Sequence, residues 1–181
     1  MRRKKTAALA TVIRVSGSSY RRPGARMLVA GDGRTWGGVS GGCLERDVAR
    51  RARLIIDNGI ADLRQYDTTD DFDSGAALGC AGVIEIFIER ISTELPGPIP
   101  ALRTSQVDRQ LVAQATVITS VDKSLFPGTR YFSGSSSTFA MELLTEVLEN
   151  GMTGMRTCDR VELFVELHRS PQALVFFGGG K

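Results

Sequence analysis

The sequence predicts an α+β protein built from two pseudo-repeated strand–hairpin–helix–strand units with a mixed sheet. Three observations support this prediction: an internal repeat, apolar residues spaced as in strands or helices, and glycine-containing turns between them. The repeat is the most informative, because ATVI at Ala10 returns at Ala115, and PGAR at Pro23 returns as PGTR at Pro127. We therefore expect the two halves to share one scaffold.

The elements of the first unit follow from local patterns. A strand is predicted from Ala8 to Val15, and a hairpin over residues 27–40 because Asp32-Gly33 offers turn chemistry between two extended runs. Apolar residues recur at helical spacing from Leu44 to Asn58, and the following glycine can end that helix. Residues 83–91 alternate as a half-buried strand does.

The second unit repeats the later elements at shorter offsets. NGIADLRQYD at Asn58 returns as NGMTGMRTCD at Asn150, and IEIFIE at Ile84 returns as VELFVE at Val161. The predicted organisation is a first repeat over residues 1–92, a Pro-containing linker over 93–107, a degenerate second repeat over 108–170, and an ending over 171–181. That ending, QALVFFGGGK, is similar to the first strand of a truncated Rossmann unit, and we assign no dinucleotide to it.

The distance along the chain between matching segments decreases twice, and each decrease marks residues that only the first half possesses. These stretches are the neighbourhoods of SGGC, residues 40–43, and of TTDDFDSGAALGCAG, residues 68–82. Because the second copy shows that the scaffold can be built without them, they are the better candidates for chemistry.

Cys43 is the leading candidate within these stretches. It lies at or just before the start of the predicted helix, where unpaired backbone N–H groups and the helix dipole favour a thiolate and attract anions. Gly41 and Gly42 would let a ligand approach the backbone closely. The alternative is a tight turn with an inert buried cysteine.

Other candidates flank or resemble this segment. Cys80 lies in a glycine-rich loop, and Asp70 and Asp71 belong to an acidic run that lacks any standard metal-binding spacing. The loop SGSSYRRPGAR, residues 16–26, could cradle a phosphate through its serines and through Arg21, Arg22 and Arg26, although Arg26 has a counterpart in the second half.

Composition limits the function classes. A net charge of +3 is too mild to indicate nucleic-acid binding, and the longest apolar runs are too short for a membrane span. The three cysteines lack CxxC spacing, so we expect reduced thiols and a cytoplasmic protein. Cys158 aligns with Tyr66 in a shared stretch and is expected to be structural. His168 is the single histidine, which disfavours a Cys-His hydrolase.

Four segments together resemble the XdhC/CoxI family of maturation factors: ATVIRVSGSSYRRPGARMLV, GGVSGGCLE, YDTTDD and LGCAGVIEIFIE. The resemblance is strong over the first half and looser over the second. It implies transient binding of molybdopterin-type molybdenum cofactor and insertion of its sulfurated form into a xanthine or carbon monoxide dehydrogenase. It also implies that Cys43, and then Cys80, are the thiols nearest the cofactor, and that a complete Rossmann domain is absent.

The resulting hypothesis is a cofactor chaperone with no turnover of its own. Its partners would be a molybdenum hydroxylase and a cysteine desulfurase, and pairing of protomers stays open. Cys43 would be the metal ligand, no catalytic residue is assigned, and the cofactor-binding candidates are Ser40, Gly41, Gly42, Cys43, Cys80, Arg21, Arg22, Arg26, Asp70 and Asp71. The alternatives are a thiol oxidoreductase or sulfurtransferase that uses Cys43, and a non-functional fragment.

Overall fold

The computed structural model describes residues 6–67, 82–92, 97–134, 139–173 and 175. Its elements are β1 (Ala7–Gly17), β2 (Arg26–Ala30), β3 (Thr35–Gly37), α1 (Glu45–Asn58), β4 (Asp62–Asp67), β5 (Gly82–Ile91), α2 (Ile99–Val107), β6 (Val112–Ser120), β7 (Arg130–Phe132), α3 (Met141–Asn150), β8 (Gly154–Cys158) and β9 (Val161–His168). The predicted α+β class is confirmed.

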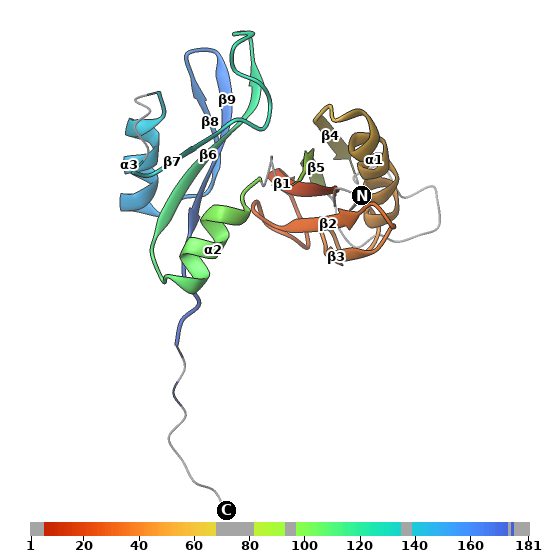
Figure 1. The fold of residues 1–181 in the computed structure, drawn as a ribbon, viewed down its shortest axis with the longest axis horizontal. Helices are drawn as coiled ribbons and strands as arrows, with labels where there is room; N and C mark the ends of the chain where they lie inside the picture. The colour runs from red at the N-terminus through yellow and green to blue at the C-terminus, as the bar shows by residue number, and fades with distance from the viewer. Residues whose placement is uncertain (1–5, 68–81, 93–96, 135–138, 174, 176–181) are drawn as a thin grey trace, which may run out of the picture.

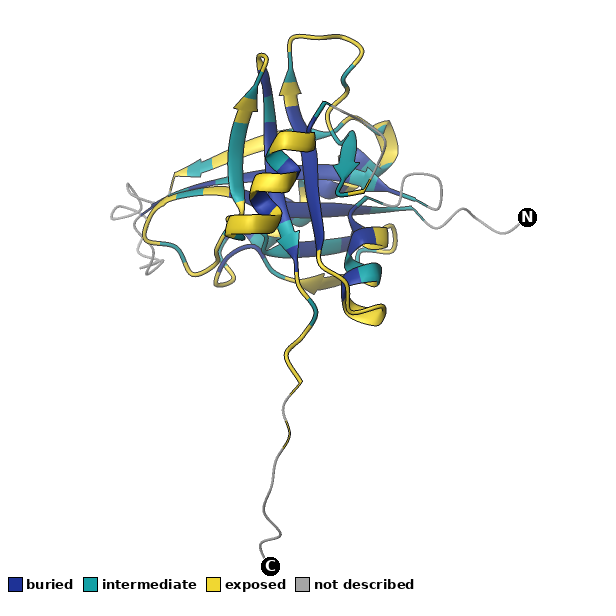
Figure 2. Ribbon diagram, turned by 90° about the vertical axis from the view of Figure 1, so that its left-hand side faces the viewer, coloured by how far each residue is buried: buried dark blue, intermediate teal, exposed yellow. Residues whose placement is uncertain are grey.

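The strands form two sheets, one from each half of the chain (Figure 1). The first sheet has the order β3-β2-β1-β5-β4 and the second the order β7-β6-β9-β8. Helix α1 covers one sheet and α3 the other, each on the side that faces away from the opposite half (Figure 1). In Figure 2 the outer face of the helix nearest the viewer, α3, is exposed, whereas β6 and β9 behind it are mostly buried.

The helices begin and end where their sequences allow. In α1 the residues Val48, Ala52 and Ile55 are buried against the first sheet, one helical turn apart on a single stripe. Gly59 ends this helix in the left-handed conformation at φ 76° and donates its N–H to the Ile55 carbonyl. Gly151 ends α3 in the same way at φ 70°. Both helices thus finish at the repeated Asn-Gly pair.

The predicted repeat is present down to a local irregularity of the backbone. The pairing of β1 with β5 shifts register between Val12 and Arg14, and the pairing of β6 with β9 shifts between Val117 and Thr119. These β-bulges occupy equivalent positions of the two copies. A bulge re-aims the side chain beside it, and Ile13 and Ile118 belong to one buried cluster that joins the halves.

Two buried ion pairs cross between the halves in a reciprocal manner. Arg26 of β2 binds Glu166 of β9 at 2.5 Å, and Arg130 of β7 binds Glu89 of β5. Each arginine also donates a hydrogen bond to the carbonyl two residues before it, at Gly24 or Gly128. The repeated PGAR and PGTR segments therefore provide matched contacts that hold the two sheets together.

Three details differ from the sequence-based prediction. Every strand pairing within the described residues is antiparallel, so the expected mixed sheet is not formed. The region predicted as a linker contains α2, because prolines are tolerated in the first turn of a helix. Residues 171–173 and 175 lie outside any strand, and the rest of the predicted final strand falls outside the described residues.

Candidate functional site

Cys43 lies in the segment that connects β3 to α1, two residues before the helix begins. Its side chain is half-buried and packs against the core cluster of the first half. Gly41 and Gly42 before it are exposed, and, apart from its chain neighbours, no described residue has an atom within 4 Å of the position that a Cβ of Gly42 would occupy. A ligand can therefore approach the cysteine from the side of these two glycines.

Ser40 organises the backbone around the cysteine. Its side-chain oxygen accepts hydrogen bonds from the N–H groups of Gly42 at 3.1 Å and Leu44 at 3.2 Å. The Cys43 thiol donates to the same oxygen at 3.4 Å. Ser40 is buried, with 5% of its surface exposed, so these contacts fix the loop firmly.

Glu45 holds the other side of this loop. Its carboxylate accepts hydrogen bonds from the N–H groups of Val39 at 3.1 Å and Ser40 at 2.8 Å, and from the Ser40 hydroxyl at 2.5 Å. Burial raises the pKa of Glu45, but hydrogen bonds from Ser40 and from the backbone outweigh it and lower the pKa below its ordinary value. The carboxylate is thus held in its charged form.

A second carboxylate of the same helical turn is tied to β4. Asp47 accepts hydrogen bonds from Arg50 at 2.6 Å, Arg51 at 2.7 Å and the Tyr66 hydroxyl at 2.8 Å. Hydrogen bonds from Arg50 and Arg51 are the main reason that the pKa of Asp47 is lowered. Burial and the bond to Asp47 raise the pKa of Tyr66 to about 12. These contacts anchor the start of α1 to the end of β4.

The first turn of α1 bears on the thiolate prediction. Glu45 and Asp47 are both acidic and offset the positive end of the helix dipole. The sulfur itself lies beside a hydroxyl oxygen that already accepts two backbone hydrogen bonds. The expected preference for a free thiolate at Cys43 stays a prediction.

The loop that precedes β2 lies over the SGGC segment. The Tyr20 ring lies against Gly41, with its Cγ 3.6 Å from the position a Cβ would take. The Arg21 guanidinium stacks on Tyr20 at 5.4 Å from the ring centroid and reaches 4.0 Å from the equivalent position at Gly38. Arg21 is exposed and forms no ion pair with a described residue, so the structure brings one of the predicted arginines, with its charge, to the cysteine loop.

The remaining candidates divide into three groups. Arg22 is exposed in the same loop as Arg21. The guanidinium of Arg26 is instead engaged with Glu166 of the second half. Cys80, Asp70 and Asp71 lie outside the described residues; the residues that flank their segment, Asp67 and Gly82, end β4 and begin β5 on neighbouring strands.

Cys158 and His168 lie in the second half. Cys158 ends β8 and packs against the second core cluster, as Tyr66 does against the first. His168 is buried at the end of β9, with Nε2 3.3 Å from Oε1 of Gln114. Both side chains thus belong to the second sheet, and among the described residues the cysteine site is built from the first half.

The sequence-based prediction missed Glu45 and Tyr20, both of which shape the site. A signal for Glu45 existed: α1 has 14 residues and α3 has 10, and both end at the repeated Asn-Gly pair. The extra turn therefore lies at the N-terminal end, where Glu45 and Asp47 adjoin Cys43. Tyr20 carried no comparable signal, because its role depends on a fold that brings the loop onto Gly41.

Among the residues that the structure describes, the site offers one thiol, that of Cys43. Within the described residues, no group of three or more His, Cys, Asp or Glu side chains could hold a metal ion. Cys43 could thus supply one soft ligand to a metal that arrives with other ligands of its own, and Arg21 could meet an anionic group on the same molecule. No described helix has the length and apolar character needed to cross a membrane.

Comparison with known sequences places the first part of the chain. Residues 1–67 match the model of the XdhC and CoxI family, which confirms the resemblance for this region. A protein from Bacillus subtilis, named as a probable subunit of xanthine dehydrogenase, is 42% identical over 93 residues, which cover 50% of this chain and 28% of that protein. The molybdenum cofactor insertion chaperone PaoD from Escherichia coli is 33% identical over 93 residues, covering 51% and 29%.

Comparison with solved structures supports the fold of both halves. A crystal structure described as a xanthine dehydrogenase from Bacillus halodurans matches with a TM-score of 0.66 and 24% sequence identity. The match covers 92% of this chain and 49% of that one. The matches thus cover 28% and 29% of the two sequence relatives and about half of the structural relative.

Proposed function

We propose that this chain, whose first 67 residues match the XdhC and CoxI family, takes part in inserting molybdenum cofactor into a molybdenum enzyme. The observation that carries the proposal is the position of Cys43. Its half-buried thiol is held by Ser40 beside two exposed glycines, inside the segment that matches the family. One relative that shares this half of the chain is named as a molybdenum cofactor insertion chaperone.

Each described residue of the site would have a separate task toward the cofactor, which is the cargo of the protein. Cys43 would give a sulfur ligand to molybdenum, since thiolates suit soft metals. Ser40 and Glu45 would position that sulfur, because they fix the loop on both sides. Arg21 would bind the anionic part of the cofactor beside Gly38 and Gly41.

The finer proposal concerns the cofactor form and the partners. We propose that the chain holds the sulfurated cofactor, receives sulfur through a cysteine desulfurase, and delivers to a xanthine or carbon monoxide dehydrogenase. One sequence relative is named for a xanthine dehydrogenase, which supports that class of target. A single thiol ligand also suits transfer, because fewer bonds must break when the cargo leaves.

The test compares cofactor retention by matched cysteine variants. Wild type, Cys43→Ala and Cys158→Ala are mixed anaerobically with molybdenum cofactor, desalted, and analysed for molybdenum and pterin. We expect Cys43→Ala to retain only background, and Cys158→Ala to behave as wild type because it belongs to the second half. Ser40→Ala should weaken retention by roughly tenfold, the usual effect of losing a group that orients a metal ligand.

Two outcomes would contradict the proposal. Equal retention by wild type and Cys43→Ala would place the cofactor elsewhere. A stable persulfide on Cys43 after incubation with a desulfurase, formed without any retention of cofactor, would instead favour the sulfurtransferase alternative.

A further inference from the structure

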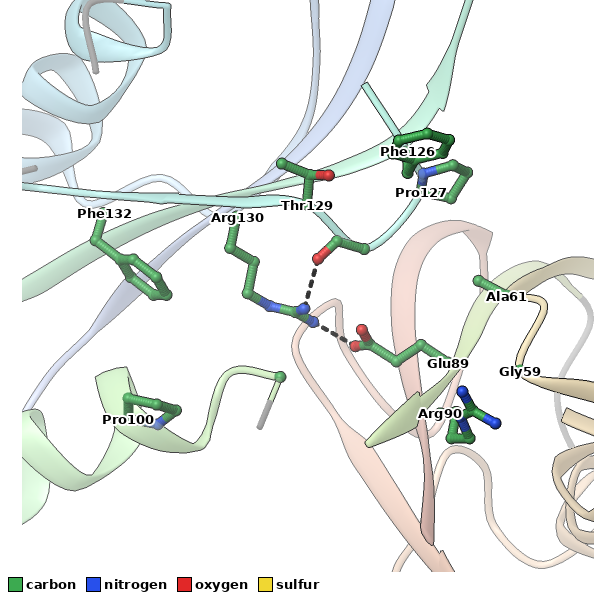
Figure 3. Close-up of a pocket in the computed structure, with 12 residues that line it drawn as sticks. Gly59, Ala61, Glu89, Arg90, Pro100, Phe126, Pro127, Thr129, Arg130 and Phe132 are labelled. Carbon is green, nitrogen blue, oxygen red and sulfur yellow. Dashed lines mark hydrogen bonds and ion pairs between the residues drawn. The ribbon is translucent and has the colours of Figure 1, made fainter. Parts of the chain in front are cut away.

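A cavity of about 510 Å³ lies between the two halves at the Glu89–Arg130 ion pair (Figure 3). This volume is within the range of roughly 300–1,000 Å³ that is usual for small-molecule sites. Its walls come from β5 and the turn after α1, from the start of α2, and from the segment that leads into β7. The cavity is thus built by both repeats and the helix that joins them.

Rings and prolines form the apolar walls. Figure 3 shows Phe132 and Pro100 on one side of the Glu89–Arg130 pair, and Phe126 and Pro127 on the other. Phe126 is 68% exposed, so a ligand could reach its ring. Aromatic faces with a few convergent polar groups are typical of sites for flat ring systems.

One cationic side chain of the cavity has no counter-charge among the described residues. Glu89 and Arg130 neutralise each other, with 7% and 11% of their side-chain surfaces exposed. Arg90 follows Glu89 and also lines the cavity, where its guanidinium lies beside Gly59. Among the described residues, Arg90 has no carboxylate within ion-pair distance. The cavity therefore combines aromatic walls with a guanidinium suited to an acidic group.

The pseudo-repeat supplies a matched cavity that shows which features are additional. A cavity of about 270 Å³ lies at the Arg26–Glu166 pair and is lined by Pro23 and Gly24, the counterparts of Pro127 and Gly128. The repeat places Arg22, Leu28 and Leu167 at the positions of Phe126, Phe132 and Arg90. The counterpart cavity also has a guanidinium, that of Arg169 beside Gly151, and no described carboxylate pairs with it. The scaffold is thus formed without the two rings, so the rings are the feature that points to a ligand rather than to folding.

This cavity is separate from the cysteine site. Gly59, at the C-terminal end of α1, lines it, whereas Cys43 precedes the N-terminal end of that helix. A helix of 14 residues is about 20 Å long at 1.5 Å per residue. The cavity and the cysteine thus lie at opposite ends of α1.

We propose that this cavity binds a small molecule that has a planar aromatic ring system and an acidic substituent, of about the size of a mononucleotide. The ring lies between the phenylalanine and proline walls, and Arg90 binds the acidic group. The site does not depend on Cys43, so it extends the function of the chain beyond the cysteine site.

The test separates the ring from the charge with three probes. Flavin mononucleotide has both features, riboflavin has the ring alone, and inorganic phosphate has the charge alone. Fluorescence polarisation should show that the mononucleotide binds roughly tenfold more tightly than riboflavin, because only it engages Arg90. Phosphate should not compete at comparable concentrations.

Matched variants assign the effect to the cavity. Arg90→Gln should reduce binding of the mononucleotide to the level of riboflavin, and Phe126→Ala should weaken both flavins by roughly tenfold. Arg169→Gln, at the counterpart cavity, and Cys43→Ala should bind as wild type. Far-UV circular dichroism checks the fold of each variant. Absence of flavin binding by wild type, or binding that survives both cavity substitutions, would overturn the proposal.

Discussion

The two halves of the molecule share a scaffold to the level of a single β-bulge, but their surfaces carry different chemistry. In the first half, α1 is one turn longer than α3, and the added turn adjoins Cys43. In the second half, Phe126 before β7 and Phe132 at the end of β7 stand where the first half carries Arg22 and Leu28. Each copy thus keeps the common framework and adds a candidate site that the other lacks.

In this duplicated fold, the positions that the two halves share differ in role from the positions that they do not share. The shared positions are those that join the sheets, such as the arginine of each PGxR segment and its glutamate partner. The unshared positions lie at the helix start, before β7 and at the end of β7, outside these contacts. Substitutions in both sets can test whether the shared contacts are energetically equivalent and whether the unshared ones are dispensable for folding.

The largest effects on stability are expected at the crossed ion pairs. Arg130→Met and Arg26→Met should each lower the free energy of unfolding by about 3 kcal/mol, because each leaves a buried glutamate without its partner. Burial already raises the pKa of Glu166 while Arg26 opposes that rise. Urea unfolding at neutral pH measures both variants.

The control is another arginine that spans the halves at the surface. Arg14 lies 3.2 Å from Glu85 and 3.7 Å from Glu162, but 48% of its side chain is exposed. Arg14→Met should therefore cost less than about 1 kcal/mol. If Arg14→Met were as costly as the buried substitutions, or if Arg26→Met were neutral, the equivalence of the crossed pairs would be refuted.

These crossed pairs also mark the limit of what the sequence could predict. Alternation and turn residues identified the strands and helices because they are local signals. The partners Arg130 and Glu89 are 41 residues apart, and Arg26 and Glu166 are 140 apart. No local pattern connects such residues, so only the fold reveals that the repeated arginines exchange partners.

Three further differences have identifiable physical causes. Pro98 and Pro100 suggested a break in the chain, yet proline suits the first turn of a helix, and α2 forms there. The mixed sheet was wrong because the relative direction of paired strands depends on which distant strands meet, and every described pairing is antiparallel. At the candidate site, Ser40 and Cys43 were predicted from their glycine-rich motif, whereas Glu45 was not, because its hydrogen bonds run backward to the loop.

An effect of intermediate size is expected at His168, whose counterpart in the first half is Ile91. Burial, together with the charges of Arg26 and Arg130, lowers the pKa of His168 to about 4. Between pH 6.5 and 4 the unfolded chain binds a proton that the folded chain does not. Because of this group, the free energy of unfolding of the wild type should thus fall by about 2 kcal/mol between pH 7 and pH 5.

His168→Ile removes this group and copies the first half. Over the same pH interval, the free energy of unfolding of this variant should fall by about 2 kcal/mol less than that of wild type. Urea titrations at pH 7, 6 and 5 compare the two proteins directly. Because the carboxylates are common to both, an identical pH dependence would show that His168 is not held in its neutral form by burial.

The smallest effect is expected where the added turn of α1 meets β4. Tyr66→Phe deletes the hydrogen bond to Asp47 but leaves Arg50 and Arg51 on that carboxylate. It should lower the free energy of unfolding by about 1 kcal/mol. In an ultraviolet titration of the tyrosines, the variant should also lack the group whose pKa is raised to about 12.

Tyr131→Phe in the second half is the matched control, since its ring packs on Phe139 and no described residue bonds its hydroxyl. This substitution should change stability by less than about 0.5 kcal/mol. Equal losses from the two substitutions would mean that the Tyr66–Asp47 contact does not anchor the added turn. A loss confined to Tyr66→Phe, with cofactor retention at Cys43 unchanged, would show that the turn is stabilised by contacts distinct from those of the site beside it.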